Sequence, residues 1–184
     1  VQTCALPISP ANMALGTSVS NAGDVNGDGL ADVMVSSKTA GGGGSVYVLY
    51  GTRAGTGLDM DLNVSGGTIA ASRGFRISDA QAGSNLGARV ASAGDVNGDG
   101  LADMIVAGPN GYNSNTYIVY GNDSGTGVVI DSNGKISANQ GFRLVGSVGT
   151  GVASAGDING DGLADLVVGA NPAANDYRYG VILG

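Results

Sequence analysis

The sequence contains no histidine, no tryptophan and no glutamate, so all 15 of its acidic residues are aspartates. Without histidine, the chain cannot build a Ser-His-Asp or Cys-His nucleophilic system or a histidine-ligated zinc site. It has no run of about 18 or more apolar residues, so we expect no membrane insertion. The formal net charge of −7 disfavours non-specific binding to nucleic acid or to an anionic membrane surface. These absences exclude several classes of enzyme and predict no nucleic-acid partner.

The chain has a single cysteine, Cys4, which lies in an opening segment that matches nothing else in the sequence. This segment, VQTCALPI, is a permitted translation of GTT CAG ACG TGT GCT CTT CCG ATC, which resembles a common short-read sequencing adapter. We predict that residues 1–8 are not native protein and leave them out of the fold prediction. A natural irregular N-terminus is the alternative. If the prediction holds, the chain is a fragment whose true N-terminus, with any signal peptide, lies outside this sequence.

Glycine is abundant, with 35 residues, and many of these glycines belong to a decad that occurs three times. The decad reads GDVNGDGLAD at Gly23–Asp32 and Gly94–Asp103, and GDINGDGLAD at Gly156–Asp165. A short apolar run rich in β-branched residues follows each copy. Alternating segments such as GSVYVLYG (44–51) and NTYIVYG (115–121) then follow, as is typical of strands. No segment has the apolar periodicity of a helix, so the sequence predicts an all-β chain built from repeats.

Each repeat holds about four short strands separated by glycine-rich turns, and such a unit cannot bury both of its faces alone. Four-stranded units arranged radially form a β-propeller, typically of about four to eight blades. We predict blades at residues 9–78, 79–145 and 146–184, the last of them incomplete. A sandwich or a β-solenoid is the alternative, although a solenoid needs a much shorter repeat. Because about three blades cannot close a ring, further blades of the same chain are expected.

Each decad also contains the pattern D-x-[DN]-x-[DN]-G, the first half of a calcium-binding loop. We number each loop from its first aspartate, which is the second residue of the decad. Oxygen-bearing side chains then occupy positions one, three, five and nine, and the residue at position seven can offer its backbone carbonyl. Calcium takes about six to eight oxygen ligands, whereas magnesium demands strict octahedral geometry and keeps its waters, so the loops favour calcium. The predicted metal ligands are Asp24, Asn26, Asp28, Leu30, Asp32, Asp95, Asn97, Asp99, Leu101, Asp103, Asp157, Asn159, Asp161, Leu163 and Asp165.

Two other interpretations compete with this calcium site. An EF-hand requires glutamate at position twelve, where the chain has Val35, Val106 and Val168. Plain hairpin turns also favour Asn-Gly and Asp-Gly pairs. However, two carboxylates about 4 Å apart repel by roughly 4 kcal/mol at an effective dielectric constant near 20, so a turn without a cation gains nothing from three of them. We predict about three Ca²⁺ ions, one per blade, which would change the formal net charge from −7 to −1.

The residues around the decads extend this pattern. The sequence A-G-D-[VI]-N-G-D-G-L-A-D is followed by an apolar run and, in the first two copies, by G-F-R-[IL]. This pattern resembles the FG-GAP repeats of integrin α-chain propellers and their bacterial relatives, and it covers almost all of the chain from about residue 14 onward. The resemblance implies a β-propeller, usually seven-bladed, with calcium held in the loop that joins the first two strands of a blade.

The predicted function is that of a calcium-binding propeller module for adhesion, or for binding a protein or glycan ligand. Millimolar calcium is an extracellular condition to which weak sites of this loop type are suited, so we expect a secreted or cell-surface protein. No catalytic residue is predicted, and the chain itself is expected not to be an enzyme. The alternative is an accessory propeller domain of a larger secreted enzyme such as a hydrolase, and nothing in the sequence decides between the two.

Overall fold

The computed structural model describes residues 15–37, 43–53, 69–110, 113–145, 148–170 and 179–184. These residues form twelve β-strands and no helix, which confirms the predicted all-β class. None of them forms a helix long and apolar enough to cross a bilayer. The segment predicted not to be native protein, residues 1–8, lies outside the described residues.

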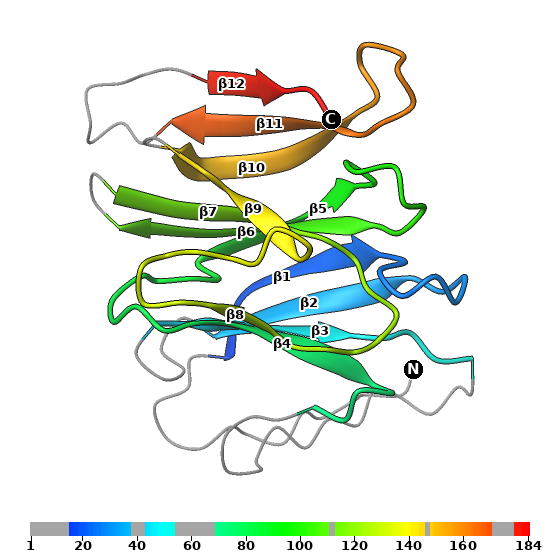
Figure 1. The fold of residues 1–184 in the computed structure, drawn as a ribbon, viewed down its shortest axis with the longest axis horizontal. Coiled ribbons are helices and arrows are strands. Elements are labelled where there is room, and N and C mark those ends of the chain that lie inside the picture. Colours follow the sequence, from blue (N-terminus) through cyan, green and yellow to red (C-terminus); the bar gives the residue numbers. More distant parts are fainter. Residues whose placement is uncertain (1–14, 38–42, 54–68, 111–112, 146–147, 171–178) are drawn as a thin grey trace.

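The strands form three sheets that follow one another along the chain, and consecutive strands within each sheet pair in antiparallel fashion (Figure 1). The first sheet consists of β1 (Leu15–Gly23), β2 (Asp32–Ser37), β3 (Ser45–Leu49) and β4 (Gly74–Asp79). The second consists of β5 (Arg89–Gly94), β6 (Asp103–Asn110), β7 (Asn113–Val119) and β9 (Gly141–Leu144). The third consists of β10 (Val148–Gly156), β11 (Asp165–Ala170) and β12 (Tyr179–Ile182).

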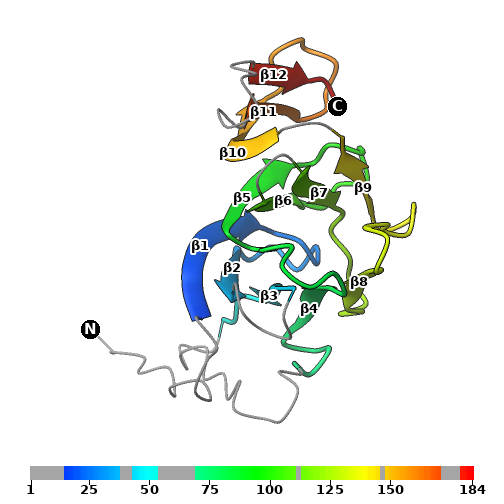
Figure 2. The same ribbon diagram turned by 90° about the vertical axis from the view of Figure 1, so that its left-hand side faces the viewer.

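The first strands of the three sheets lie next to one another. Figure 2 shows β1, β5 and β10 along one side of the molecule, with each sheet extending away from that side. This is how the innermost strands of neighbouring blades line the axis of a propeller. The arrangement is therefore propeller-like, as predicted.

The second sheet is buried on both faces. On one face, Val106 of β6 packs in a cluster that includes Met34 of β2. On the other face, the preceding residue Ile105 packs in a second cluster that includes Leu166 of β11. Successive side chains of a strand point to opposite faces, so the continuous apolar run of β6 suits a strand that lies between two neighbouring sheets.

One further strand, β8 (Val128–Ile130), is not predicted by the sequence. It belongs to the connection between β7 and β9 of the second sheet, yet it pairs in parallel with β4 of the first sheet, with Ile77 opposite Val128. Val128 and Ile130 are buried in the cluster between the two sheets, whereas Val129 is 62% exposed. Through β8, the second repeat therefore pairs with the outer edge of the first sheet and packs against it.

Substitutions in β8 should reveal how strongly this strand holds the two sheets together. Ile130→Ala should lower the free energy of unfolding by about 2–5 kcal/mol, because it removes buried apolar surface and leaves a cavity. Val129→Ala, at the exposed neighbouring position, should cost less than about 1 kcal/mol. Urea unfolding followed by circular dichroism measures both values. Equal costs would contradict the inward orientation of Ile130.

Candidate functional site

The three acidic loops lie at the same end of their sheets. Residues 24–31 connect β1 to β2, residues 95–102 connect β5 to β6, and residues 157–164 connect β10 to β11. All three project on the right-hand side of Figure 1. The repeated sequence therefore produces three similar loops in a row.

Within each loop, the first acid organises the turn, and the second loop illustrates this. Asp95 Oδ1 accepts hydrogen bonds from the backbone N–H groups of Gly98 (2.7 Å) and Asp99 (3.2 Å), and Oδ2 accepts one from Gly100 (2.8 Å). Asn97 Oδ1 also accepts a bond from the Asp99 N–H (2.9 Å). The side-chain oxygens at positions one and three therefore converge on one amide. The corresponding bonds form in the other two loops.

The acid at position five is tied to the same turn. Asp99 Oδ1 accepts a hydrogen bond from the Leu101 N–H (2.8 Å), and Oδ2 accepts one from Asn97 Nδ2 (2.9 Å). Gly98 and Gly100 adopt left-handed backbone conformations, with φ of 76° and 87°, which bend the chain around these side chains. Three of the predicted ligand side chains in this loop thus form one connected group on an exposed turn.

The aspartate at position nine behaves differently because it is buried. Asp103 is fully buried, and its Oδ2 accepts a hydrogen bond from the Val96 N–H (2.9 Å) while its Oδ1 accepts one from the Gly121 N–H (2.9 Å). Gly121 follows the third strand of the sheet, so one carboxylate joins the loop to the far side of the blade. Asp32 and Asp165 make the equivalent pairs of bonds. The sequence predicts these residues only as metal ligands and misses this structural role.

Neighbouring loops also contact each other directly. The Ala102 N–H donates to the Asp24 carbonyl (2.9 Å), and the Ala164 N–H donates to the Asp95 carbonyl (2.8 Å). A Cβ placed on Gly94 would lie only 2.6 Å from Ala164 Cβ. Sequence reasoning misses this contact, although alanine is the ninth residue of all three decads. The loops therefore form a stack in which each one packs on the next.

Comparison with protein families agrees with this architecture. The family described as FG-GAP repeat matches residues 15–49, and the family described as FG-GAP-like repeat matches residues 95–168. The chain is an FG-GAP repeat protein. The predicted resemblance is thereby confirmed.

Several known proteins resemble this FG-GAP repeat chain. Integrin alpha-4 of Xenopus laevis is 26% identical over 155 residues, which cover 81% of the chain and 14% of the integrin. Integrin alpha-PS5 of Drosophila melanogaster is 27% identical over 165 residues, covering 85% of the chain and 15% of the integrin. Phosphatidylinositol-glycan-specific phospholipase D of Mus musculus is 38% identical over 88 residues, covering 44% of the chain and 10% of that protein. The chain therefore spans only a small part of the length of these relatives.

In two acidic loops of this FG-GAP repeat protein, the buried aspartate has a raised pKa. Burial raises the pKa of Asp103 to about 6; the hydrogen bonds from Gly121 and Val96 oppose this shift, and the charges of Asp99 and Asp95 add to it. For the equivalent residue in the first loop, burial is again the main cause of a raised pKa, and its own acidic neighbours add to it. The repulsion between carboxylates that the sequence predicts thus acts on the buried acid of both loops.

The donor atoms of each loop suit a hard cation in chemical type. They are carboxylate and amide oxygens, which are the ligands that calcium prefers. A carboxylate oxygen has two lone pairs, so one that accepts a single hydrogen bond can still bind a metal. Within the part of the chain that the structure describes, however, no three acidic, histidine or cysteine side chains are grouped closely enough to hold a metal as they stand. The residues therefore fit calcium by their chemistry, and gathering them around an ion requires some side-chain movement.

A pair of glycine substitutions tests the packing of loop on loop. Gly94→Ala should destabilise the protein by more than Gly156→Ala, because only the first new methyl group meets a neighbouring alanine. Both glycines have left-handed φ values, of 76° and 69°, so the backbone strain is matched. Thermal unfolding of the two variants measures the difference. Equal melting temperatures would show that the loops do not pack as described.

The raised pKa of Asp103 predicts a pH dependence in calcium-free solution. The folded-state pKa of about 6 exceeds the ordinary value of 3.8, so the folded protein binds more protons between these values. The free energy of unfolding should therefore fall as pH rises from about 4 to about 6. Asp103→Asn, which cannot titrate, should make this slope shallower when urea unfolding is repeated across the range with a chelator present. An unchanged slope in this variant would contradict the assignment.

Proposed function

We propose that each acidic loop binds one calcium ion and that the chain is a calcium-stabilised propeller module for adhesion, or for binding a protein or glycan. The observation that carries this proposal is the thrice-repeated group of side-chain oxygens at positions one, three and five, adjacent to a buried aspartate. In the second loop the proposed ligands are Asp95, Asn97 and Asp99, the Leu101 carbonyl and Asp103. The first and third loops would use the corresponding residues.

Calcium would offset the repulsion between the carboxylates of the first two loops. A cation beside Asp95 and Asp99 would favour the ionised form of the buried Asp103, whose pKa their charges help to raise. If free calcium exceeds the dissociation constant by ten- to a hundredfold, each site adds about 1.4–2.7 kcal/mol to the free energy of unfolding. Because neighbouring loops are hydrogen-bonded, ordering one loop also supports the next.

We propose a secreted or cell-surface location for this module. Two of the relatives are integrin alpha chains, and extracellular calcium is concentrated enough to fill weak sites of this type. The chain itself would have no catalytic role.

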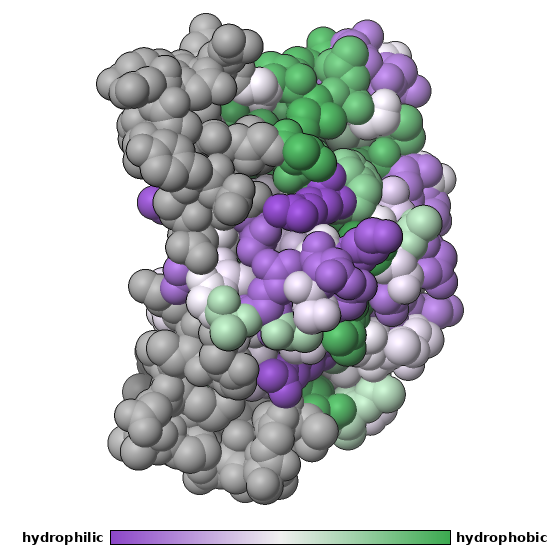
Figure 3. All heavy atoms as spheres, turned by 60° about the vertical axis from the view of Figure 1, so that its left-hand side comes forward, coloured by the Kyte–Doolittle hydropathy of each residue, from purple (hydrophilic) through white to green (hydrophobic). Residues whose placement is uncertain are grey.

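Further blades of the same chain would complete the propeller in this proposal. Val167 and Val181 of the third sheet are 39% and 49% exposed. Their counterparts by strand register in the second sheet, Ile105 and Ile118, are fully buried in the cluster shared with the third sheet. Figure 3 shows apolar surface at the end of the molecule formed by the third sheet. This outer face has the character of a surface against which another blade packs.

An accessory propeller in a larger secreted enzyme is the second candidate. The similarity to phosphatidylinositol-glycan-specific phospholipase D, at 38% identity over 88 residues, favours it. In that case the same calcium-bound scaffold would support a catalytic domain elsewhere in the polypeptide. A hydrolase domain encoded in the same gene product would decide for this candidate.

Calorimetric titration with calcium tests the loop assignment. The protein should bind about three ions, and Asp28→Ala should remove one of them, because it deletes the carboxylate at position five of the first loop. Asp123→Ala is the matched control: it removes the same charge at an exposed position outside the acidic loops. If Asp28→Ala binds calcium with the same stoichiometry and affinity as the unsubstituted protein, the proposal is wrong. Loss of a site in the control as well would point to a non-specific effect of charge.

A further inference from the structure

The first acidic loop is contacted by two consecutive residues of the second loop. These are Leu101 and Ala102, at positions seven and eight, and the Ala102 N–H donates to the Asp24 carbonyl (2.9 Å). A Cβ placed on Gly23 would lie only 2.5 Å from Ala102 Cβ. One placed on Gly27 would lie 3.0 Å from Leu101 Cδ2. The second loop therefore packs on the first both before and after Asp24, its first proposed ligand.

The same contacts recur between the second and third loops. The Ala164 N–H donates to the Asp95 carbonyl (2.8 Å). A Cβ placed on Gly94 would lie 2.6 Å from Ala164 Cβ. One placed on Gly98 would lie 3.0 Å from Leu163 Cδ2. In both pairs of loops, the leucine and alanine at positions seven and eight thus position the loop of the preceding repeat.

A continuous series of contacts also joins the buried aspartates of the first two loops. In the first loop, the Val25 N–H donates to Asp32 Oδ2 (2.9 Å). The carbonyl oxygen of the same residue would lie 2.9 Å from a Cβ placed on Gly121. The Gly121 N–H in turn donates to Asp103 Oδ1 (2.9 Å). One valine and one glycine therefore connect the two buried carboxylates.

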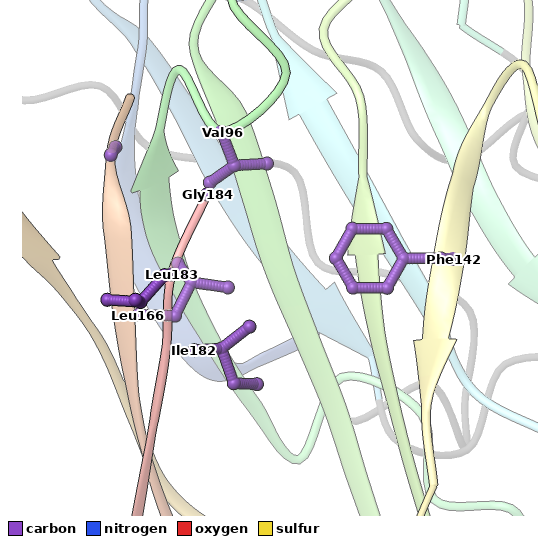
Figure 4. A pocket seen from close by; sticks show the side chains of 7 residues that line it. Val96, Phe142, Leu166, Ile182, Leu183 and Gly184 are labelled. Carbon is purple, nitrogen blue, oxygen red and sulfur yellow. The ribbon is translucent and has the colours of Figure 1, made fainter. Parts of the chain in front are cut away.

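The second and third loops are joined in the same way. Figure 4 shows Val96 of the second loop beside Gly184, which follows β12. The Val96 N–H donates to Asp103 Oδ2 (2.9 Å). The Gly184 N–H donates to Asp165 Oδ1 (3.0 Å). A shift of either buried carboxylate would therefore move atoms that touch the neighbouring loop.

We propose that the acidic loops bind their calcium ions cooperatively, an inference that rests on the calcium sites of the proposed function. An ion in the second loop would take the Leu101 carbonyl as a ligand and so order the two residues that pack around Asp24. The first loop would then lose less conformational freedom when it binds its own ion, which raises its affinity. By thermodynamic linkage, an ion in the first loop raises the affinity of the second by the same factor.

The charges of the loops alone predict the opposite effect. With its three aspartates ionised, the second loop carries a formal charge of −3, and a bound Ca²⁺ changes this to −1. In Asp99→Ala without an ion, the same loop carries −2. The more negative neighbour attracts a cation to the first loop more strongly, so charge alone would tighten binding there. Weaker binding at the first loop in this variant would therefore point to the contacts between the loops.

An NMR titration measures this coupling, because each loop has its own glycine amides. Calcium is added to the full 184-residue protein labelled with ¹⁵N, and the amides of Gly29, Gly100 and Gly162 report the first, second and third loops. In Asp99→Ala, the dissociation constant read at Gly29 should rise at least about fivefold relative to the unsubstituted protein. Asp28→Ala should weaken binding read at Gly100 by a similar factor.

A second pair of variants leaves every proposed ligand in place. Ala102→Gly removes the methyl group that packs on Gly23, so it should weaken binding at the first loop, as read at Gly29. Ala164→Gly is the matched control, since it makes the same change one repeat later and should act on the second loop, as read at Gly100.

The outcomes separate the coupling from the calcium sites themselves. If none of the three glycine amides responds to calcium, the proposed sites are wrong and the coupling falls with them. If the loops bind calcium but Asp99→Ala leaves binding at the first loop unchanged or tightens it, the sites stand and the cooperativity is wrong. Equal weakening of the first loop by Ala102→Gly and Ala164→Gly would also overturn the proposal.

Discussion

The buried carboxylate at position nine of each acidic loop is the interaction on which the rest of the structure depends. Asp32, Asp103 and Asp165 each connect two backbone amides that lie far apart in the sequence, one in the loop and one after the third strand. Hydrogen bonds to a charged acceptor are stronger than neutral ones, and a buried carboxylate without partners would be costly. Every blade therefore holds its loop in place through a residue that is both buried and ionisable.

The acidic side chains of these loops have two opposing effects on the structure. The exposed acids at positions one and five organise the turn through backbone bonds, but their charges oppose ionisation of the buried one. In the proposed calcium-bound form, the cation would reduce that opposition. The loops also stack on one another through alanine and glycine contacts, so each blade packs directly on the next. The proposed calcium would thus stabilise the assembly of blades.

Much of the fold could be predicted because the information is local and repeated. The decads mark the turn between the first two strands of each unit, and the apolar runs after them predict β2, β6 and β11. The strand β8 could not be predicted, since its partner β4 belongs to the preceding repeat and parallel pairing leaves no turn signal in the sequence. The hydrogen bonds of Asp103 could not be predicted for a related reason. Its second donor, the Gly121 N–H, comes close to Asp103 only when β6 and β7 pair. The blade boundaries and the metal ligands stay predictions.

Amide hydrogen exchange at Val96 and Gly121 tests this account most directly, because both N–H groups donate to the buried Asp103 carboxylate. The measurement is made by NMR on the calcium-free protein and repeated with saturating calcium. The account predicts slow exchange at both amides in both conditions, and fast exchange at both in Asp103→Ala, which has no side-chain acceptor. Rapid exchange at Val96 and Gly121 in the unsubstituted protein, whether or not calcium is present, would contradict it.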